Sequence, residues 1–342
     1  MKITRKKFGQ HVNGRQCYLW ILQAGEVTAT FTDYGASWLS FLMPDSKGNS
    51  DDILLGCASF GPLTQKHPYF GAGIGRFGNR IAGGRFAIEG KSYQLPQNDG
   101  PNCLHGGYAG FDRRMWQTRA YKKKGWLYVS FSYLSADGEE GFPGNMDCTI
   151  TYGLSQNAEL SIEYAANVDA ACPVNLTNHA YFNLKGQGRG NILDHELTLN
   201  SSHYLPVDNT AIPTGELQPV QGTAFDFRKG KAIGQDIEQT GAGYDHCFVV
   251  DGQEGELRNC AAVFERESGR SMIVLTSHPG VQLYTGNFLE NAGKDGSFYG
   301  RHSGFCLETQ HYPDSPNQPN FPSAIFGPDR PYSEKTLFSF DW

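Results

Sequence analysis

Apolar and polar residues alternate along much of the chain. In residues 126–133, Leu127, Val129 and Phe131 occupy every second position, and mostly polar residues lie between them. Side chains of a β-strand point alternately to the two faces of a sheet, so this pattern predicts a strand with one buried face. The same period of two recurs in two later stretches, residues 148–154 and 159–166.

Tight turns join several of these stretches. Residues 86–93 predict a hairpin that turns at Gly90, and residues 262–275 predict another that turns at Gly269. No stretch carries a convincing 3.6-residue period over the length of an ordinary helix. The chain is therefore predicted to be all-β, a large antiparallel β-sandwich. No linker divides it, so residues 1–342 are expected to form a single domain.

The composition agrees with a turn-rich β protein and removes some classes of function. The 42 glycines, 17 tyrosines and 22 phenylalanines are typical of such a protein, and the net charge is −6. This charge argues against nucleic acid or an anionic membrane as a partner, whereas a neutral small molecule is indifferent to it. No apolar run approaches transmembrane length, and no apolar signal-peptide core follows the basic start near Lys6.

Eight cysteines are scattered along the chain, and no two of them form a Cys-x-x-Cys pair. A chain of this length does not need disulfides to stabilise it. We therefore expect reduced, mostly buried thiols and a cytoplasmic protein. The sequence does not decide between a monomer and a homodimer.

Three polar segments combine proton carriers with amides, hydroxyls and aromatic rings. They are residues 102–107 (NCLHGG), 178–183 (NHAYFN) and 306–310 (CLETQ), the last followed by 313–317 (PDSPN). Loops beside sheet strands are where functional sites are commonly built. Two histidines and one glutamate can move protons, and their neighbours suit a polyhydroxylated ligand. We interpret the set as one site for proton transfer on a free sugar, without a cofactor.

The candidate proton-carrying histidines are His179 and His105. Alternation places His179, Tyr181 and Asn183 on one face, and a histidine in a polar row can act as a general acid. His105 lies in a Leu-His-Gly-Gly turn, where the glycines leave its imidazole uncovered for a ligand. The alternatives are a hydrogen-bonded core histidine at position 179 and a surface histidine at position 105.

The candidate base is Glu308. It lies in a segment that is poor in charge, so we expect it to be half-buried, and burial would raise its pKa toward the range useful to a general base. The alternative is a salt bridge to Arg301 or Arg80. Asp245 is a second acid in a similarly apolar segment.

Further residues could hold the sugar. Arg80 offers a fork of donors and Asn79 offers both a donor and an acceptor, so the pair can bind adjacent hydroxyls. Gln282 alternates onto one face with Tyr284 as a hydroxyl partner, and Tyr181 can stack on a sugar ring. For Arg80, a structural ion pair with an acid on a neighbouring strand is the alternative.

Two other kinds of site are rejected on spacing and context. Residues 73–78 match Gly-x-Gly-x-x-Gly, but no buried strand precedes them and a later glycine pair would interrupt a following helix, so no dinucleotide site is expected. Glu308 and His311 are three residues apart, and side chains with that spacing face opposite ways on a strand. No metal site is therefore expected.

Ordered motifs over nearly the whole chain resemble the aldose 1-epimerase family, and within it the galactose mutarotases. They include residues 75–81 (GRFGNRI), 104–112 (LHGGYAGFD), 141–145 (GFPGN), 175–184 (NLTNHAYFNL), 244–246 (YDH) and 313–317 (PDSPN). The resemblance implies a β-supersandwich. It also implies the interconversion of α and β anomers of free aldoses, chiefly galactose and glucose, in hexose metabolism.

The resemblance further implies roles for individual residues. His179 would protonate the ring oxygen and Glu308 would take the proton of the C1 hydroxyl. The opened ring would then turn about the C1–C2 bond and close on the other face. His105 matches a position that helps to hold the ring oxygen. Sugar-binding positions are matched by Asn79, Arg80, Asp245 and Gln282.

Three other functions stay open from the sequence. A relative acting on hexose 6-phosphates would need a cationic cluster, for which Arg76, Arg80 and Arg85 are the candidates. A glycosidase could use Asp245 and Glu308 as its pair of carboxyl groups. A non-catalytic sugar-binding protein would not need a glutamate together with two histidines.

Overall fold

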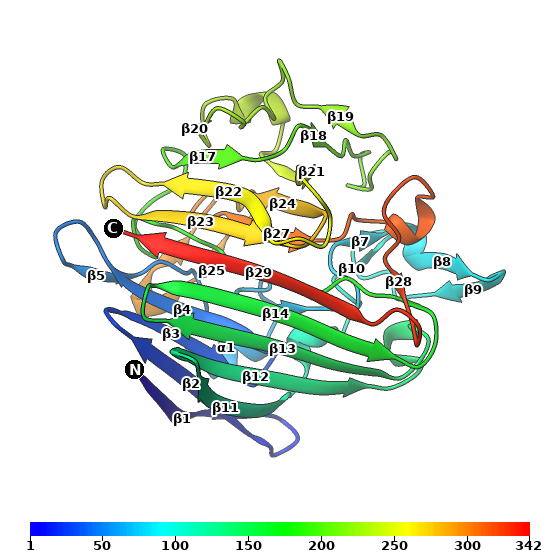
Figure 1. Cartoon of the computed structure of the whole chain (residues 1–342), viewed down its shortest axis with the longest axis horizontal. Coiled ribbons are helices and arrows are strands. Elements are labelled where there is room, and N and C mark those ends of the chain that lie inside the picture. The colour runs from blue at the N-terminus through cyan, green and yellow to red at the C-terminus, as the bar shows by residue number, and fades with distance from the viewer.

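The computed structural model describes all 342 residues and is built almost entirely from antiparallel strands (Figure 1). Its largest sheet has nine strands and forms one layer of the molecule. Across this sheet the order is β11 (Gln117–Lys123), β12 (Trp126–Ser135), β13 (Met146–Ser155), β14 (Glu159–Val168), β29 (Tyr332–Asp341), β23 (Ser271–Thr276), β22 (Arg258–Phe264), β17 (Glu196–Leu199) and β20 (Lys231–Ala232).

Two five-stranded sheets form the opposite layer. The first runs in chain order through β1 (Lys2–Gln10), β2 (Gln16–Ala24), β3 (Val27–Thr32), β4 (Ser37–Pro44) and β5 (Ser50–Asp52). The second, which we call the site sheet, has the order β19 (Gln218–Pro219), β18 (His203–Tyr204), β21 (Asp245–Val249), β24 (Gly280–Tyr284) and β27 (Cys306–Gln310).

The two layers share one hydrophobic core. A single cluster of 64 buried residues draws on all three sheets, so the layers do not divide into separate cores. Aromatic rings bridge the first five-stranded sheet and the nine-stranded sheet: Phe31 meets Tyr152 at 4.5 Å between centroids, and Phe41 meets Phe340 at 4.3 Å. Leu307 of the site sheet belongs to the same cluster.

The predicted all-β class and antiparallel sandwich are confirmed. Leu127, Val129 and Phe131 of β12 are all fully buried, as their alternation predicts. The stretches 148–154 and 159–166 lie in β13 and β14. Both predicted hairpins form, as β8 (Arg85–Ile88) with β9 (Lys91–Gln94) and as β22 with β23.

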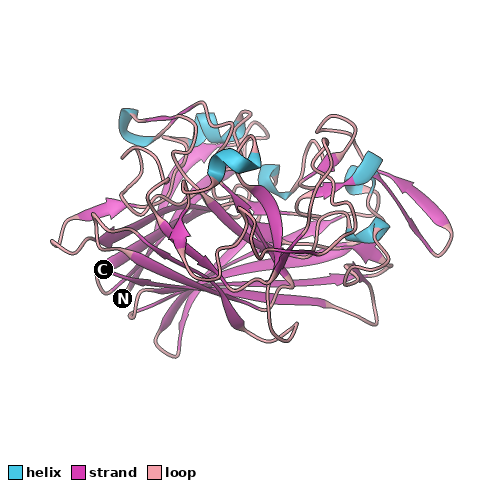
Figure 2. Ribbon diagram, turned by 90° about the horizontal axis from the view of Figure 1, so that it is seen from above, coloured by secondary structure: helices cyan, strands magenta, loops and turns pink.

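The remaining elements are short and gather with the loops along one side of the sandwich (Figure 2). Two-residue strand pairs are β6 (Gly73–Ile74) with β16 (Thr177–Asn178), β7 (Arg80–Ile81) with β10 (Cys103–Leu104), β15 (Cys172–Pro173) with β28 (Ile325–Phe326), and β25 (Asn291–Ala292) with β26 (Phe298–Tyr299). Helical segments are α1 (Phe60–Thr64) and the 3-10 turns Ala82–Gly84, Phe111–Arg113, Glu139–Gly141, Ile237–Thr240, Lys294–Gly296 and Ser315–Asn317. None of these helices has the length or apolar character needed to span a bilayer.

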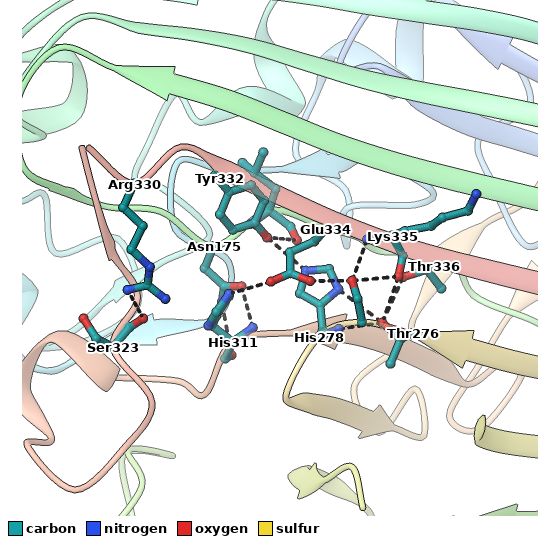
Figure 3. Close-up of polar contacts among 12 residues, drawn as sticks. Asn175, Thr276, His278, His311, Ser323, Arg330, Tyr332, Glu334, Lys335 and Thr336 are labelled. Atoms are coloured by element: carbon teal, nitrogen blue, oxygen red, sulfur yellow. Dashed lines mark hydrogen bonds and ion pairs between the residues drawn. The ribbon is translucent and has the colours of Figure 1, made fainter. Parts of the chain in front are cut away.

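A polar network joins β29 to residues next to the ends of β24 and β27 (Figure 3). Nε2 of His311 lies 3.3 Å from Oε1 of Glu334, although its N–H is not aligned for a hydrogen bond. Nε2 of His278 lies 2.9 Å from the hydroxyl oxygen of Tyr332. Burial alone would raise the pKa of Glu334, but the contact with His311 and the charge of protonated His278 outweigh it and hold this pKa at about 2.

Replacing Glu334 by glutamine is expected to lower the free energy of unfolding at neutral pH by about 2–4 kcal/mol, because a buried polar cluster loses its only carboxylate. The folded-state pKa lies below the unfolded value of about 4.3. The stabilisation by the Glu334 carboxylate is therefore complete above about pH 4.5 and is lost as the pH falls toward 2. Urea unfolding at several pH values measures it. The matched control is Glu163→Gln on β14, whose exposed carboxylate meets Lys335 at 3.0 Å; equal losses for both variants would contradict the assignment.

Candidate active site

A cavity of about 170 Å³ opens at the face of the site sheet and the loops beside it. This is smaller than the about 300–1,000 Å³ of pockets for drug-sized ligands, so the cavity fits a small molecule such as a monosaccharide. All predicted site residues except Gln282 line it. The lining residues are Pro68, Tyr69, Asn79, Arg80, Leu104, His105, His179, Tyr181, Asp245, Tyr284, Phe288 and Glu308.

A row of polar side chains crosses the site sheet, and two of its members, Glu308 and Asp245, line the cavity. Glu308 lies at the centre of β27 and pairs in register with Gln282 on β24. Nε2 of Gln282 donates to Oδ1 of Asp245 on β21 at 2.7 Å. Gln282 thus lies behind Asp245 and fixes its carboxylate, and its own Oε1 is buried without a partner.

His179 lies just after β16 and is anchored through its backbone. Its N–H donates to the carbonyl of Ala72 at 3.0 Å, and its carbonyl accepts from the N–H of Gly71 at 2.9 Å. The predicted shared face holds for His179 and Tyr181, which both line the cavity. The prediction is wrong for Asn183, because the strand does not continue and its side chain bonds loop carbonyls instead.

His105 and Asn79 support each other in strained backbone conformations. Their φ angles are 52° and 63°, in the left-handed region that non-glycine residues rarely adopt. The N–H of His105 donates to the carbonyl of Asn79, and the N–H of Asn79 donates to Nδ1 of His105, both at 3.1 Å. Because Nδ1 accepts, the neutral ring must carry its proton on Nε2. His105 is buried, so it is not the surface histidine that the sequence left open.

Aromatic rings enclose His179. Tyr181 stacks on it at 5.0 Å between centroids and Tyr69 at 5.7 Å, with interplanar angles of 20° and 19°. No pattern in the sequence indicates Tyr69 or the exposed Phe288 as site residues. Neither belongs to an alternating pattern, and only the packing of distant loops brings them to the cavity.

Burial sets the charge state of the proton carriers. It lowers the pKa of His179 to about 3 and the pKa of His105 well below its usual value, so both rings are neutral at pH 7. Burial, and then the charge of Asp245, raise the pKa of Glu308 well above its usual value, against a smaller opposing effect of Arg80. A carboxyl group in this environment is a stronger base than one in water.

Glu308 makes no salt bridge with an arginine. Its Oε1 lies 3.7 Å from Nε2 of His179, and its Oε2 is buried without any hydrogen-bond partner in the protein. Arg301 instead donates to a backbone carbonyl. Arg80 forms ion pairs with Asp99 at 2.8 Å and with Asp245 at 3.9 Å. It therefore has the structural role considered from the sequence and also lines the cavity.

His105, His179 and Glu308 also have donor atoms within 4.8 Å of one another, which is close enough to bind a metal ion. Metal-binding histidines normally donate their second ring N–H to an acceptor. Here the backbone N–H of Asn79 donates to Nδ1 of His105, so its Nε2 carries a proton where a metal would need a lone pair. The hydrogen bonding therefore suits a proton donor and does not fit a metal ligand.

Other features do not compete as sites. A hollow of about 770 Å³ lies beside β17 and β20, but each of its basic residues already forms an ion pair: Lys185 with Asp194 at 3.6 Å, Lys231 with Asp236 at 2.6 Å and Arg266 with Glu196 at 2.9 Å. Arg76, a candidate for phosphate binding, is buried and donates to backbone carbonyls and to Ser135. These groups already have partners.

Comparison with known proteins agrees with this geometry. The family model described as aldose 1-epimerase matches residues 18–339. Galactose mutarotase of Homo sapiens is 45% identical over 342 residues, covering 99% of this chain and 98% of the relative. Aldose 1-epimerase of Escherichia coli (strain K12) is 38% identical over 322 residues, 92% of each chain. The crystal structure of galactose 1-epimerase from Lactobacillus acidophilus NCFM superposes with a TM-score of 0.87 at 27% identity, covering 99% of this chain and 98% of that one. The chain therefore belongs to the aldose 1-epimerase family.

Proposed function

We propose that the protein is an isomerase that interconverts the α and β anomers of free aldohexoses, chiefly galactose and glucose. The observation that carries the proposal is the placement of Glu308. Its carboxyl group is 3% exposed, has one oxygen without a partner, and lies beside a neutral histidine in a cavity of monosaccharide size. A buried base next to a proton donor fits ring opening of a hemiacetal.

In the proposed mechanism, Glu308 takes the proton of the C1 hydroxyl while the neutral His179 gives its Nε2 proton to the ring oxygen. The negative charge passes from Glu308 to the His179 ring until the closing step returns both protons. The C1–O5 bond breaks as the C1–O1 bond becomes a carbonyl. The open-chain aldehyde rotates about C1–C2, and the C5 hydroxyl attacks the other face of the carbonyl. In this closing step His179 takes a proton back and Glu308 returns one, so that no net proton or electron is consumed.

The other lining residues hold the sugar in this mechanism. The Nε2–H of His105 would donate to the ring oxygen, because its Nδ1 accepts the N–H of Asn79 and the proton of the neutral ring is on Nε2. Asn79, Arg80 and Asp245 bind hydroxyl groups, and Tyr181 presents an aromatic ring to the sugar. Gln282 acts from behind by holding Asp245. The reaction requires neither redox chemistry nor an activated donor.

Optical rotation tests the proposal against its alternatives. With micromolar protein, freshly dissolved α-galactose should reach its equilibrium rotation faster than in buffer, and α-glucose should respond equally or less. Galactose 6-phosphate should respond less, because Arg80 is the only arginine at the cavity and it already pairs with two carboxylates.

Two outcomes would contradict the proposal. An unchanged decay of α-galactose rotation with folded protein would reduce the protein to a sugar-binding function. Release of the aryl group from an aryl galactoside would instead indicate a glycosidase. Methyl α-galactoside is the matched control, because it has no C1 hydroxyl proton for Glu308 to take.

We also propose that residues 1–342 act as a single domain in the cytoplasm, as a monomer or a homodimer. The shared core of 64 residues supports the single domain. The eight unpaired cysteines support a reducing compartment, since disulfides are rare there. Light scattering with size-exclusion chromatography would determine the oligomeric state.

A further inference from the structure

The two ring nitrogens of His179 face different partners. Nε2 lies 3.7 Å from Oε1 of Glu308, on the cavity side. Nδ1 lies 3.5 Å from Sγ of Cys306, which is fully buried. Cys306 precedes Glu308 by two residues on β27, so both side chains project from the same face of the strand. One strand thus contacts both sides of the His179 ring.

The location of the proton on this ring decides whether His179 can act as an acid. A neutral imidazole carries one N–H, on either Nδ1 or Nε2. Burial keeps His179 neutral at pH 7. Only the tautomer with the proton on Nε2 can donate toward the cavity, whereas the other tautomer would direct its proton at the sulfur.

The neighbouring histidine shows how this protein sets a tautomer. A donor, the N–H of Asn79, lies 3.1 Å from Nδ1 of His105 and forces its proton onto Nε2. At His179 the group in the corresponding place is the thiol of Cys306. In both histidines that line the cavity, a potential donor therefore faces Nδ1 and leaves Nε2 to carry the proton.

Cys306 has the properties of a donor at this position. Burial, and then the charges of Glu308 and Asp245, raise the pKa of its thiol well above the usual value, so the sulfur keeps its hydrogen. The other possible partner for an Nδ1–H is the carbonyl of His179 itself, which lies near the ring. That carbonyl already accepts the N–H of Gly71 at 2.9 Å, so it is a weaker acceptor for a second hydrogen bond from Nδ1–H.

We infer that Cys306 is a positioning residue whose S–H donates to Nδ1 of His179 and holds the ring in the tautomer that carries its proton on Nε2. The inference rests on the proposed function, because the tautomer matters only if His179 is the acid. It also explains how the ring is reset. After each cycle the returning proton must occupy Nε2 again, and a donor at Nδ1 prevents it from moving to the other nitrogen.

Nitrogen-15 NMR of histidine-labelled wild-type protein tests whether His179 carries its proton on Nε2. Long-range proton–nitrogen correlations distinguish the two tautomers. In the free protein at neutral pH, His179 and His105 should both show a protonated Nε2 and an unprotonated Nδ1. A His179 ring protonated mainly on Nδ1 would overturn the inference. This arm does not depend on catalysis, so it separates a failure of the inference from a failure of the proposed function.

Three variants test whether the thiol of Cys306 sets this tautomer. Cys306→Ala removes the donor, so the Nδ1–H tautomer of His179 should appear, and kcat for α-galactose should fall about three- to tenfold with little change in KM. Cys306→Ser keeps a donor and should restore both the tautomer and most of kcat. Cys260→Ala is the matched control, because Cys260 is an equally buried thiol on β22 away from the cavity.

The control should change neither the tautomer nor kcat. If Cys306→Ala keeps the wild-type tautomer and kcat, the thiol only fills space and the inference is wrong. If Cys306→Ala does not fold, the wild-type tautomer and the Cys306→Ser variant decide, since a serine variant with the Nδ1–H tautomer and reduced kcat would also overturn it.

Discussion

Replacing Glu308 by glutamine is expected to lower kcat for α-galactose by about 10²–10⁴-fold, the usual effect of losing a general base. The amide of glutamine is nearly isosteric with the carboxyl group but cannot accept the C1 hydroxyl proton. Its oxygen can still accept a hydrogen bond, so galactose binding should survive. Polarimetry measures the rate, and isothermal titration calorimetry measures binding on the same preparation.

The same substitution should not destabilise the protein. Because burial raises the folded-state pKa of Glu308, the carboxyl favours the folded state at low pH, and this stabilisation is lost as the pH rises through the folded pKa. At neutral pH the glutamine variant avoids that loss, so its stability should equal or exceed that of the wild type. Function at this position is expected to oppose stability.

Glu334→Gln is the matched control, because Glu334 is also a largely buried glutamate but lies on β29 and does not line the cavity. It should lose stability and keep its rate per folded molecule, which is the opposite result. A Glu308→Gln variant with a near-normal rate would remove Glu308 from the mechanism. Asp245, the other carboxylate at the cavity, would then be the remaining candidate for the base.

Replacing His179 by asparagine is expected to lower kcat by a similar factor, about 10²–10⁴-fold, because the ring oxygen loses its proton donor in the opening step. The amide can donate a hydrogen bond but does not exchange a proton at neutral pH. Calorimetry should still detect galactose binding, because the row of Glu308, Gln282 and Asp245 on the site sheet is unchanged.

His195→Asn is the control for this second substitution. His195 is fully buried, and its Nε2 accepts the backbone N–H of Leu184 at 3.0 Å, away from the cavity. The control is expected to lose stability rather than rate per folded molecule. If His179→Asn abolishes binding while turnover per bound sugar stays normal, His179 is a binding residue only.

The sequence predicts the long strands well because their information is local. Leu127, Val129 and Phe131 alternate within the ten residues of β12 and form its buried face. Two-residue strands such as β7 and β16 carry no such signal. Their pairing with β10 and β6 depends on long-range packing, which no short window of sequence contains.

The sequence predicts those site residues whose side chains are rarely found in a protein core. Charged or titratable groups in apolar segments, such as Glu308 and His179, stand out because burial of such groups is costly. Phe288 and Tyr69 could not be found in this way, because an aromatic residue is usually part of the core. The position of Gln282 behind Asp245 depends on strand register across the site sheet, which the sequence does not specify.

Exchange spectroscopy on galactose at anomeric equilibrium tests the central claim most directly, because it observes interconversion without a net reaction. With catalytic amounts of wild-type protein, cross-peaks should connect the C1 protons of the α and β anomers within one mixing time. They should be absent in buffer and with the same concentration of Glu308→Gln. Absence of cross-peaks with folded wild-type protein would contradict the account, and so would cross-peaks of equal intensity with the glutamine variant.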